Sequence, residues 1–224
     1  GAQYLPRALE SEIAEVIYGD LQDALERLDW DYVNATDKTY RANKGVVYAT
    51  LAHMAAWDGD YVKCVDACNA IIDKGMYELE SGDNIKKITE NVSPELIFQQ
   101  FYGSKDEATS PLYTGSTSSH DFYHTFLCNP YWGNSSWGST TAEPACEFEE
   151  TKLKQLFADG EDDLRWFTFF GMSPGGKVVC HKFNNFDEDA DDYLYCMNNR
   201  VIFRLADIYL LRAEANTALG NNAA

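Results

Sequence analysis

Residues 40–75 read "YRANKGVVYATLAHMAAWDGDYVKCVDACNAIIDKG", and this stretch decides the fold. Two apolar segments of helical length flank the turn "DGD" at 58–60. Thr39 precedes the first segment and is expected to cap its N-terminus, because a side-chain oxygen there accepts a free backbone N–H. Gly75 is expected to end the second segment as a C-terminal glycine cap. The stretch therefore predicts two helices joined by a tight turn.

The small and bulky residues of this stretch are spaced as in a tetratricopeptide repeat. Such a repeat places small side chains where two paired helices touch, and bulky ones beside them. In residues 40–75 the series is Tyr48, Ala52, Ala55, Gly59, Tyr61 and Cys64. The stretch "RLADIYLLRAEANTALGN" at 204–221 repeats part of this register, with Tyr209, Ala213 and Gly220 at matching positions. Both regions are therefore expected to form closely packed helices.

The last repeat is incomplete, because the chain stops before a partner helix could follow. A repeat without its partner leaves an apolar face uncovered. The chain is thus expected to be a fragment of a longer protein, or to be completed by another chain. Its start, "GAQYLPRALE", lacks the basic and then apolar pattern of a signal peptide. No apolar run is long enough to span a membrane.

Another helix is predicted near the start of the chain, in "ESEIAEVIYGDLQDALERL" at 10–28. Its apolar residues recur at steps of four and three, so they form one stripe along one face. The stripe consists of Ile13, Ile17, Leu21, Ala24 and Leu28.

The segment 76–200 has a different character. Short strands or extended segments are predicted in "MYELE", "ELIFQQFYG", "RWFTFF" and "KVVCHKF". "FEETKLKQLFADG" predicts a short helix with Leu153, Leu156 and Phe157 on one side. A long stretch between Gly103 and Pro144 is rich in Ser, Thr, Gly and aromatic residues. Connections of this length without regular structure are often functional.

The net charge of −18 restricts the partners that the chain can have. A surface this negative repels phosphate backbones and anionic lipid headgroups, so nucleic acid and the membrane surface are not expected partners. Neutral and cationic ligands remain open. Aromatic residues make up 14% of the chain, and tyrosine is the commonest of them with 14 copies.

The six cysteines contain no C-x-x-C motif and fit no common zinc site. Cys64 and Cys68 lie one helical turn apart on an apolar face. We expect them, with Tyr48 and Ala52, to be buried between paired helices and to bind nothing. Their spacing does not resolve the redox compartment.

The acidic residues show no arrangement that indicates catalysis. Doublets such as Asp162–Asp163 and Glu149–Glu150 arise by chance among 36 acidic residues, and adjacent side chains point apart. An EF-hand at 187–198 is excluded, because its sixth position holds aspartate instead of glycine. No catalytic residue, metal site or cofactor is predicted. A looser calcium site in this segment, and a zinc site at His120 and His124, remain as alternatives.

The stretch "NPYWGNSSWGS" at 129–139 places aromatic rings among glycine, serine and asparagine. Flat aromatic faces can stack on sugar rings while polar groups bind the hydroxyls, which is the usual composition of a small-ligand site. The alternative is that the rings pack into the fold and fix a long loop. Both interpretations remain open on composition alone. The residues concerned are Tyr113, Tyr131, Trp132, Asn134, Ser136 and Trp137.

Several segments, in the right order along nearly the whole chain, resemble the SusD/RagB family, the surface-exposed nutrient-binding lipoproteins of Bacteroidetes. One is the stretch at 40–75 with "YEL" following at 77–79, and another is "DDLR" at 162–165. Asn91 and Glu95 before "LIFQQF" also fit. The most specific segment is "FRLADIYLLRAEA" at 203–215.

The resemblance implies a mainly α fold, SusD-like, in which tetratricopeptide-like helix pairs pack against an irregular region with short strands. We interpret residues 1–224 as a fragment of one such domain, lacking both ends. Its helical-repeat part is 1–75, its irregular loop-rich part is 76–200, and 201–224 is the first helix of a further repeat. Separately, Arg200, Arg204, Asp207 and Glu214 are expected to be structural. On a helix, Arg204 lies one turn from both Arg200 and Asp207, so ion pairing is within reach.

The resemblance also implies a function. Family members bind glycans and work with a TonB-dependent, SusC-like transporter of the outer membrane, and they are not enzymes. They lie on the extracellular face, held by a lipid anchor that this chain does not contain. Their sugar contacts are mostly aromatic residues in variable loops. This favours Trp132, Trp137, Tyr131, Tyr113 and Asn134 as carbohydrate-binding residues for an oligo- or polysaccharide.

A second function is kept as an alternative. The helix pairs could form a tetratricopeptide-like scaffold that binds protein partners. Exposed aromatic residues in the 103–141 loop favour sugar binding, whereas exposed aromatic residues along the helices favour a protein partner.

Overall fold

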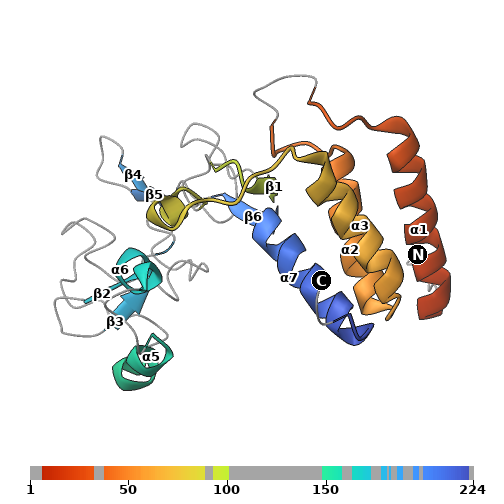
Figure 1. Cartoon of the computed structure of the whole chain (residues 1–224). Helices are drawn as coiled ribbons and strands as arrows, with labels where there is room; N and C mark the ends of the chain where they lie inside the picture. Colours follow the sequence, from red (N-terminus) through yellow and green to blue (C-terminus); the bar gives the residue numbers. More distant parts are fainter. Residues whose placement is uncertain are drawn as a thin grey trace, which may run out of the picture. The chain divides into compact units, whose positions relative to one another are not determined.

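The computed structural model contains two compact units (Figure 1). The first is mainly helical, and the described elements of the second are short helices and strands. The first contains Gly1–Leu79, Glu95–Gln99 and Ile202–Ala224. The second contains Glu80–Pro94 and Gln100–Val201. The described residues are 7–32, 38–88, 93–100, 148–157, 163–172, 178–180, 182, 186–188, 194–196 and 199–221.

The predicted helix pair forms the centre of the first unit, as α2 (Lys44–Trp57) and α3 (Tyr61–Lys74). Asp60 caps α3, because its side chain accepts the backbone N–H of Lys63 at 3.1 Å. Gly75 ends α3 with a left-handed φ of 64°, as expected for a glycine cap. These two helices and their C-terminal cap confirm the prediction for residues 40–75.

The predicted N-cap of α2 at Thr39 is wrong. The helix begins at Lys44, and its N-cap is Asn43, whose Oδ1 accepts the backbone N–H of Val46 at 3.1 Å. Thr39 instead has a φ of 71°, which is strained for a β-branched residue. Gln99 holds it there: the Gln99 backbone N–H donates to the Thr39 carbonyl at 2.9 Å, and Gln99 Nε2 donates to Thr39 Oγ1 at 2.7 Å.

Two further helices flank this pair. The helix α1 (Glu10–Arg27) packs against α2, and α7 (Leu205–Ala218) packs against α3 and α2 (Figure 1). The predicted stripe of α1 faces the pair only in part, because Ile13 is 50% exposed and no residue of α1 is fully buried. The first unit is thus a row of helices with α1 and α7 on opposite sides of α2 and α3.

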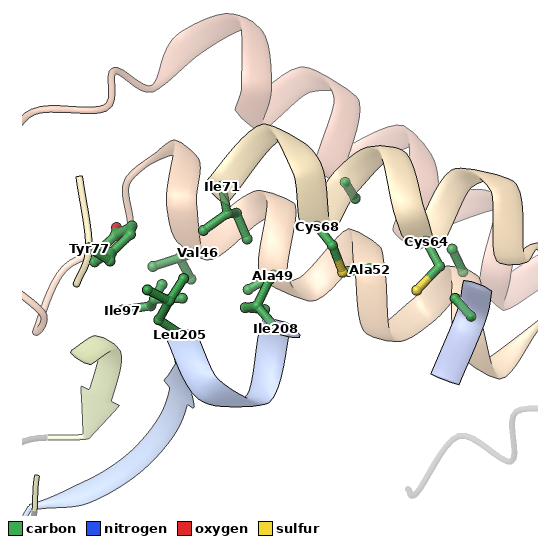
Figure 2. Close-up of a cluster of buried hydrophobic side chains, with 13 residues drawn as sticks. Val46, Ala49, Ala52, Cys64, Cys68, Ile71, Tyr77, Ile97, Leu205 and Ile208 are labelled. Carbon is green, nitrogen blue, oxygen red and sulfur yellow. The ribbon is translucent and has the colours of Figure 1, made fainter. Parts of the chain in front are cut away.

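The core of the first unit lies where α2, α3 and α7 meet, and small side chains let these helices approach closely (Figure 2). Ala49 and Ala52 on α2 and Cys64 and Cys68 on α3 have no exposed surface. Ile208 on α7 is equally buried. The expected burial of Ala52, Cys64 and Cys68 is confirmed, whereas Tyr48 is only half-buried and stacks on Trp30. The other core residues are Val46, Ala55, Ala67, Ile71, Tyr77, Ile97, Leu205 and Ala215.

We expect the thiols of Cys64 and Cys68 to resist labelling in the folded protein. Burial raises the pKa of both thiols, that of Cys68 to about 12, so neither forms the reactive thiolate near neutral pH. Peptide mass spectrometry after treatment with iodoacetamide, with and without denaturant, measures this for each cysteine. Rapid modification of either thiol in the folded protein would contradict the burial of Cys64 and Cys68 between the helices.

A strand pair joins distant parts of the sequence. The strands β1 (Leu96–Gln100) and β6 (Arg200–Arg204) form a two-stranded sheet. The backbone N–H of Leu205 donates to the Glu95 carbonyl at 2.9 Å, and Arg204 pairs with the buried Glu95 carboxylate at 3.2 Å. The predicted helical pairing of Arg200, Arg204 and Asp207 is therefore wrong, because both arginines lie on a strand. Asp207, on α7, pairs with His53 at 2.8 Å.

The second unit contains short elements. They are the 3₁₀ helix η2 (Gly82–Ile88), α5 (Glu150–Leu156), α6 (Leu164–Phe169), β2 (Phe170–Met172), β3 (Val178–Cys180), β4 (Phe186–Glu188) and β5 (Leu194–Cys196). The strand β2 pairs antiparallel with β3, with Gly171 opposite Val179. The strand β4 pairs antiparallel with β5, with Asp187 opposite Tyr195.

One of the predicted strands or extended segments is wrong. "RWFTFF" forms mostly helix, as α6, because Asp163 caps it and the strand β2 begins only at Phe170. "MYELE" forms no strand, although Tyr77 is buried in the core of the first unit. The predicted strands in "ELIFQQFYG" and "KVVCHKF", and the predicted helix in "FEETKLKQLFADG", are confirmed as β1, β3 and α5.

Candidate functional site

The five predicted carbohydrate-binding residues lie outside the described part of the chain. They are Tyr113, Tyr131, Trp132, Asn134 and Trp137. Their assignment stays a prediction. The described residues of the second unit nevertheless include an aromatic group that sequence reasoning missed.

Four aromatic rings gather around α6 in the second unit. Trp166 stacks on Phe170 with ring centroids 5.7 Å apart and planes 24° apart. Phe157, at the end of α5, lies 6.0 Å from Trp166 and 5.7 Å from Phe170. Phe148 meets Phe170 edge-on at 5.6 Å. All four side chains are half-buried, so each keeps part of its ring surface open to solvent.

The local sequence explains how this aromatic cluster forms. Asp163 caps α6 by accepting the Arg165 backbone N–H at 3.0 Å, and the helix that follows sets Trp166 and Phe170 one turn apart. The signal in the sequence was this i, i+4 spacing after an Asp cap. In an extended strand, residues four apart lie too far from each other for their rings to stack, so the strand prediction for "RWFTFF" missed this pair.

A charged pair lies beside the aromatic cluster. Arg165 donates from Nη2 to Asp163 Oδ2 at 2.7 Å and from Nε to Asp163 Oδ1 at 3.0 Å. These hydrogen bonds lower the pKa of Asp163 below its ordinary value. The Arg165 guanidinium also lies over the Phe157 ring, 5.3 Å from its centroid. The arrangement offers ring faces for stacking and a fixed carboxylate and guanidinium for hydroxyl groups, which suits a neutral polar ligand.

The other candidate groups show no catalytic or metal-binding arrangement within the described residues. Glu149 and Glu150 sit on the exposed start of α5, paired with Lys152 and Lys154 respectively. Asp163 is paired with Arg165, while Asp162 lies outside the described residues. Where side chains are described, no group of three His, Cys, Asp or Glu residues could hold a metal ion. His120, His124, Asp189 and Asp191 also lie outside the described residues.

None of the helices in the described ranges combines the length and the apolar character needed to cross a bilayer.

The C-terminal quarter of the chain, residues 169–224, matches the sequence profile of the SusD family. This segment includes β6 and α7, which complete the core of the first unit. The fold of the chain as a whole is also SusD-like. Residues 169–224 are thus similar to the SusD family in sequence, and the whole chain is similar to it in fold. No curated protein sequence gives a significant match.

Solved structures share the fold of this chain. A SusD superfamily protein from Bacteroides thetaiotaomicron matches with a TM-score of 0.73 and 20% identity, over 99% of this chain and 48% of that one. A SusD homolog from the same organism matches with a TM-score of 0.72 and 22% identity, over 94% of this chain and 48% of that one.

A third solved structure carries a functional description. A SusD-like carbohydrate binding protein from Bacteroides vulgatus matches with a TM-score of 0.58 and 17% identity, over 94% of this chain and 40% of that one. The chain thus spans about half the length of the structures that it matches.

Proposed function

We propose that this chain is the glycan-binding component of an outer-membrane polysaccharide uptake system, working with a TonB-dependent, SusC-like transporter. The observation that carries the proposal is the SusD family match at 169–224, together with the SusD-like fold. The description of the Bacteroides vulgatus neighbour as a carbohydrate binding protein supports the ligand class. The full-length protein would lie on the extracellular face of the outer membrane, held by a lipid anchor, and would have no enzymatic activity.

The charge of the chain favours a neutral glycan as the ligand. With a net charge of −18, the chain repels acidic sugars. Each acidic side chain near a bound neutral glycan also offers an acceptor for hydrogen bonds from the sugar hydroxyls. The aromatic cluster around Trp166 supports sugar stacking in the second unit, whose sequence also contains the 103–141 loop. Within that loop, Trp132, Trp137, Tyr131 and Tyr113 are the proposed stacking residues, and Asn134 is the proposed hydroxyl partner.

Substitution of the loop tryptophans tests the proposal. Trp132→Ala and Trp137→Ala are each expected to weaken binding of the cognate glycan about ten- to hundred-fold, since one stacking ring contributes on the order of 1–3 kcal/mol. Affinity electrophoresis against a panel of neutral polysaccharides finds the ligand, and calorimetry then measures the affinity. The melting temperature should stay close to that of the unmodified chain.

A matched control separates stacking from a general effect of losing a tryptophan. Trp57 is 79% exposed on α2 of the first unit, and Trp57→Ala should leave glycan affinity unchanged. Two results would refute the loop assignment: both loop variants bind the glycan as before, or both melt much earlier, as buried tryptophans would. Failure of every glycan to bind the unmodified chain would refute the proposed function itself.

The alternative function, a helical-repeat scaffold for protein partners, is favoured by one specific observation. Trp57 exposes most of its ring on a helix of the repeat. An exposed aromatic residue along the helices is the feature that distinguishes a protein-binding surface from a sugar-binding loop. The two functions are compatible, because they concern different parts of the chain.

A further inference from the structure

An apolar surface lies at one end of the first unit, formed by Leu9, Ile13 and Val16 of the α1 region with Trp57 at the end of α2. These four side chains are exposed by 66%, 50%, 63% and 79% respectively. We call them the α1–α2 patch. Large apolar groups that remain this exposed together are typical of interaction sites, whereas single exposed ones need no explanation.

The first turns of α1 carry three of the four side chains of the patch. Leu9, Ile13 and Val16 are spaced by four and three residues, so they follow one another along the same side of the helix. Trp57 lies beside the N-terminal turn of α1, because its Nε1 donates to the carboxylate of Glu10, the residue next to Leu9, at 3.3 Å. Glu12 fixes the turn by accepting the Leu9 backbone N–H at 2.9 Å.

The patch is also held in place on the helix pair. Tyr18 of α1 donates a hydrogen bond to Asp58 at 2.6 Å, just beyond Trp57. Lys63 lies over the Tyr18 ring at 4.6 Å from its centroid and pairs with Asp60 at 3.0 Å. These contacts hold α1 against the turn between α2 and α3. A partner would therefore bind a preformed surface, and little conformational entropy would be lost on binding.

The charges around the patch determine which partner fits. The helix α1 carries six carboxylates and a single basic residue, Arg27, which pairs with Asp23 at its far end. The carboxylates belong to Glu10, Glu12, Glu15, Asp20, Asp23 and Glu26, and all six residues are exposed. A polar rim of one sign around an apolar centre selects a partner with the opposite rim.

We propose that the α1–α2 patch is a docking surface for a protein segment that presents an apolar ridge flanked by lysine and arginine. Trp57 is its central anchor, since exposed tryptophan surrounded by apolar and charged residues contributes more to protein interfaces than other residue types. An anionic bilayer does not fit, because the carboxylates repel it. A second copy does not fit either, because both surfaces carry the same negative charge.

A defined peptide pair tests this surface. The probe is a labelled helical peptide of leucine and lysine with leucine at i, i+3, i+4 and i+7, and its twin has glutamate in place of lysine. Fluorescence anisotropy with the whole chain should show binding of the lysine peptide, weakening as salt rises, and no binding of the glutamate twin. Trp57→Ala should weaken binding at least tenfold, and the double variant Glu12→Lys/Glu15→Lys should weaken it to a similar degree at low salt.

Matched variants control for bulk attraction to an acidic protein. Leu210, 70% exposed on α7 at the opposite side of the helix pair, should be replaceable by alanine without effect. The double variant Asp73→Lys/Glu78→Lys makes the same charge change as Glu12→Lys/Glu15→Lys, but near the other end of α2, where Asn43 forms a hydrogen bond with Tyr77. It should weaken binding of the lysine peptide less than twofold. Circular dichroism shows that each variant is folded.

Each contrary outcome overturns the proposal. Three of these outcomes concern the lysine peptide: the chain does not bind it, the Asp73/Glu78 variant weakens its binding as much as the Glu12/Glu15 variant does, or Trp57→Ala leaves its binding unchanged. The other two concern other partners: the chain binds anionic phosphatidylglycerol vesicles through the patch, or it forms a dimer in sedimentation that Trp57→Ala dissociates. Glycan affinity of the patch variants should equal that of the unmodified chain. Failure of the proposed glycan function therefore shows up separately, as the absence of glycan binding in every variant.

Discussion

Replacing Ile208 with alanine is expected to lower the free energy of unfolding by about 2–5 kcal/mol, the usual range for truncating a buried isoleucine. Ile208 has no exposed surface and lies on α7 where this helix meets α2 and α3 (Figure 2). The neighbours Ala49 and Cys68 are too small to fill the cavity that the change leaves. Urea unfolding followed by circular dichroism measures the loss.

Leu210 provides the matched control for this change. It lies two residues further along α7 and is 70% exposed, so Leu210→Ala should change the stability by less than about 0.5 kcal/mol. Comparable losses in the two variants would show that α7 does not bury the face assigned to it. A loss below about 1 kcal/mol for Ile208→Ala would lead to the same conclusion.

Asn43→Ala is expected to cost about 2–4 kcal/mol, because Asn43 both caps α2 and satisfies other buried groups. Its Oδ1 accepts the Val46 backbone N–H at 3.1 Å. Its Nδ2 donates to the Trp30 carbonyl at 2.8 Å and to the Tyr77 hydroxyl at 3.0 Å. Alanine removes the cap and leaves the buried Tyr77 hydroxyl and the partly buried Trp30 carbonyl without this donor.

A second N-cap isolates the capping contribution. Asp60 accepts the Lys63 backbone N–H at the same distance of 3.1 Å, but its side chain is 42% exposed. Asp60→Ala should therefore cost about 1 kcal/mol, the typical value for losing a cap, because the ion pair with Lys63 that is lost with it is exposed and contributes little. Thermal and urea unfolding of both variants compares the two sites. Equal losses would mean that the buried contacts of Asn43 add nothing to the cap.

The helical part of the fold could be predicted because its signals are local. The spacing of Ala52, Ala55 and Cys64 encodes the close approach of two helices, and the structure buries all three at that contact. Gly75 identifies its helix end for an equally local reason, since only a residue that tolerates positive φ fits there.

The errors arise where distant residues decide the local conformation. Thr39 resembles an N-cap in sequence, but Gln99, sixty residues away, bonds its backbone and side chain and holds it outside the helix. Arg204 continues an apparently helical pattern, yet pairing of β6 with β1 makes it part of a strand beside the buried Glu95. In "RWFTFF" the Asp163 cap outweighs the aromatic composition that favours a strand.

The site was less predictable than the fold. Composition drew attention to the rings of "NPYWGNSSWGS", which lie outside the described residues, whereas the stacked pair of Trp166 and Phe170 depends on the exact start of α6. The α1–α2 patch could not be found from periodicity either. Ile13 belongs both to the predicted stripe and to the patch, and only the position of α2 decides which residues of α1 stay exposed.

The pairing of β1 with β6 has a consequence for how this chain can change over evolutionary time. The two strands hold together the ends of a stretch of about one hundred residues, between Gln100 and Arg200, that returns to the helical unit where it left. For a loop whose ends are fixed, doubling the length costs only about 0.6 kcal/mol in closure entropy. Insertions, deletions and replacements within this stretch should therefore change the stability of the helical unit very little. The strand pair therefore allows this stretch to change in length and sequence while the helical core stays the same.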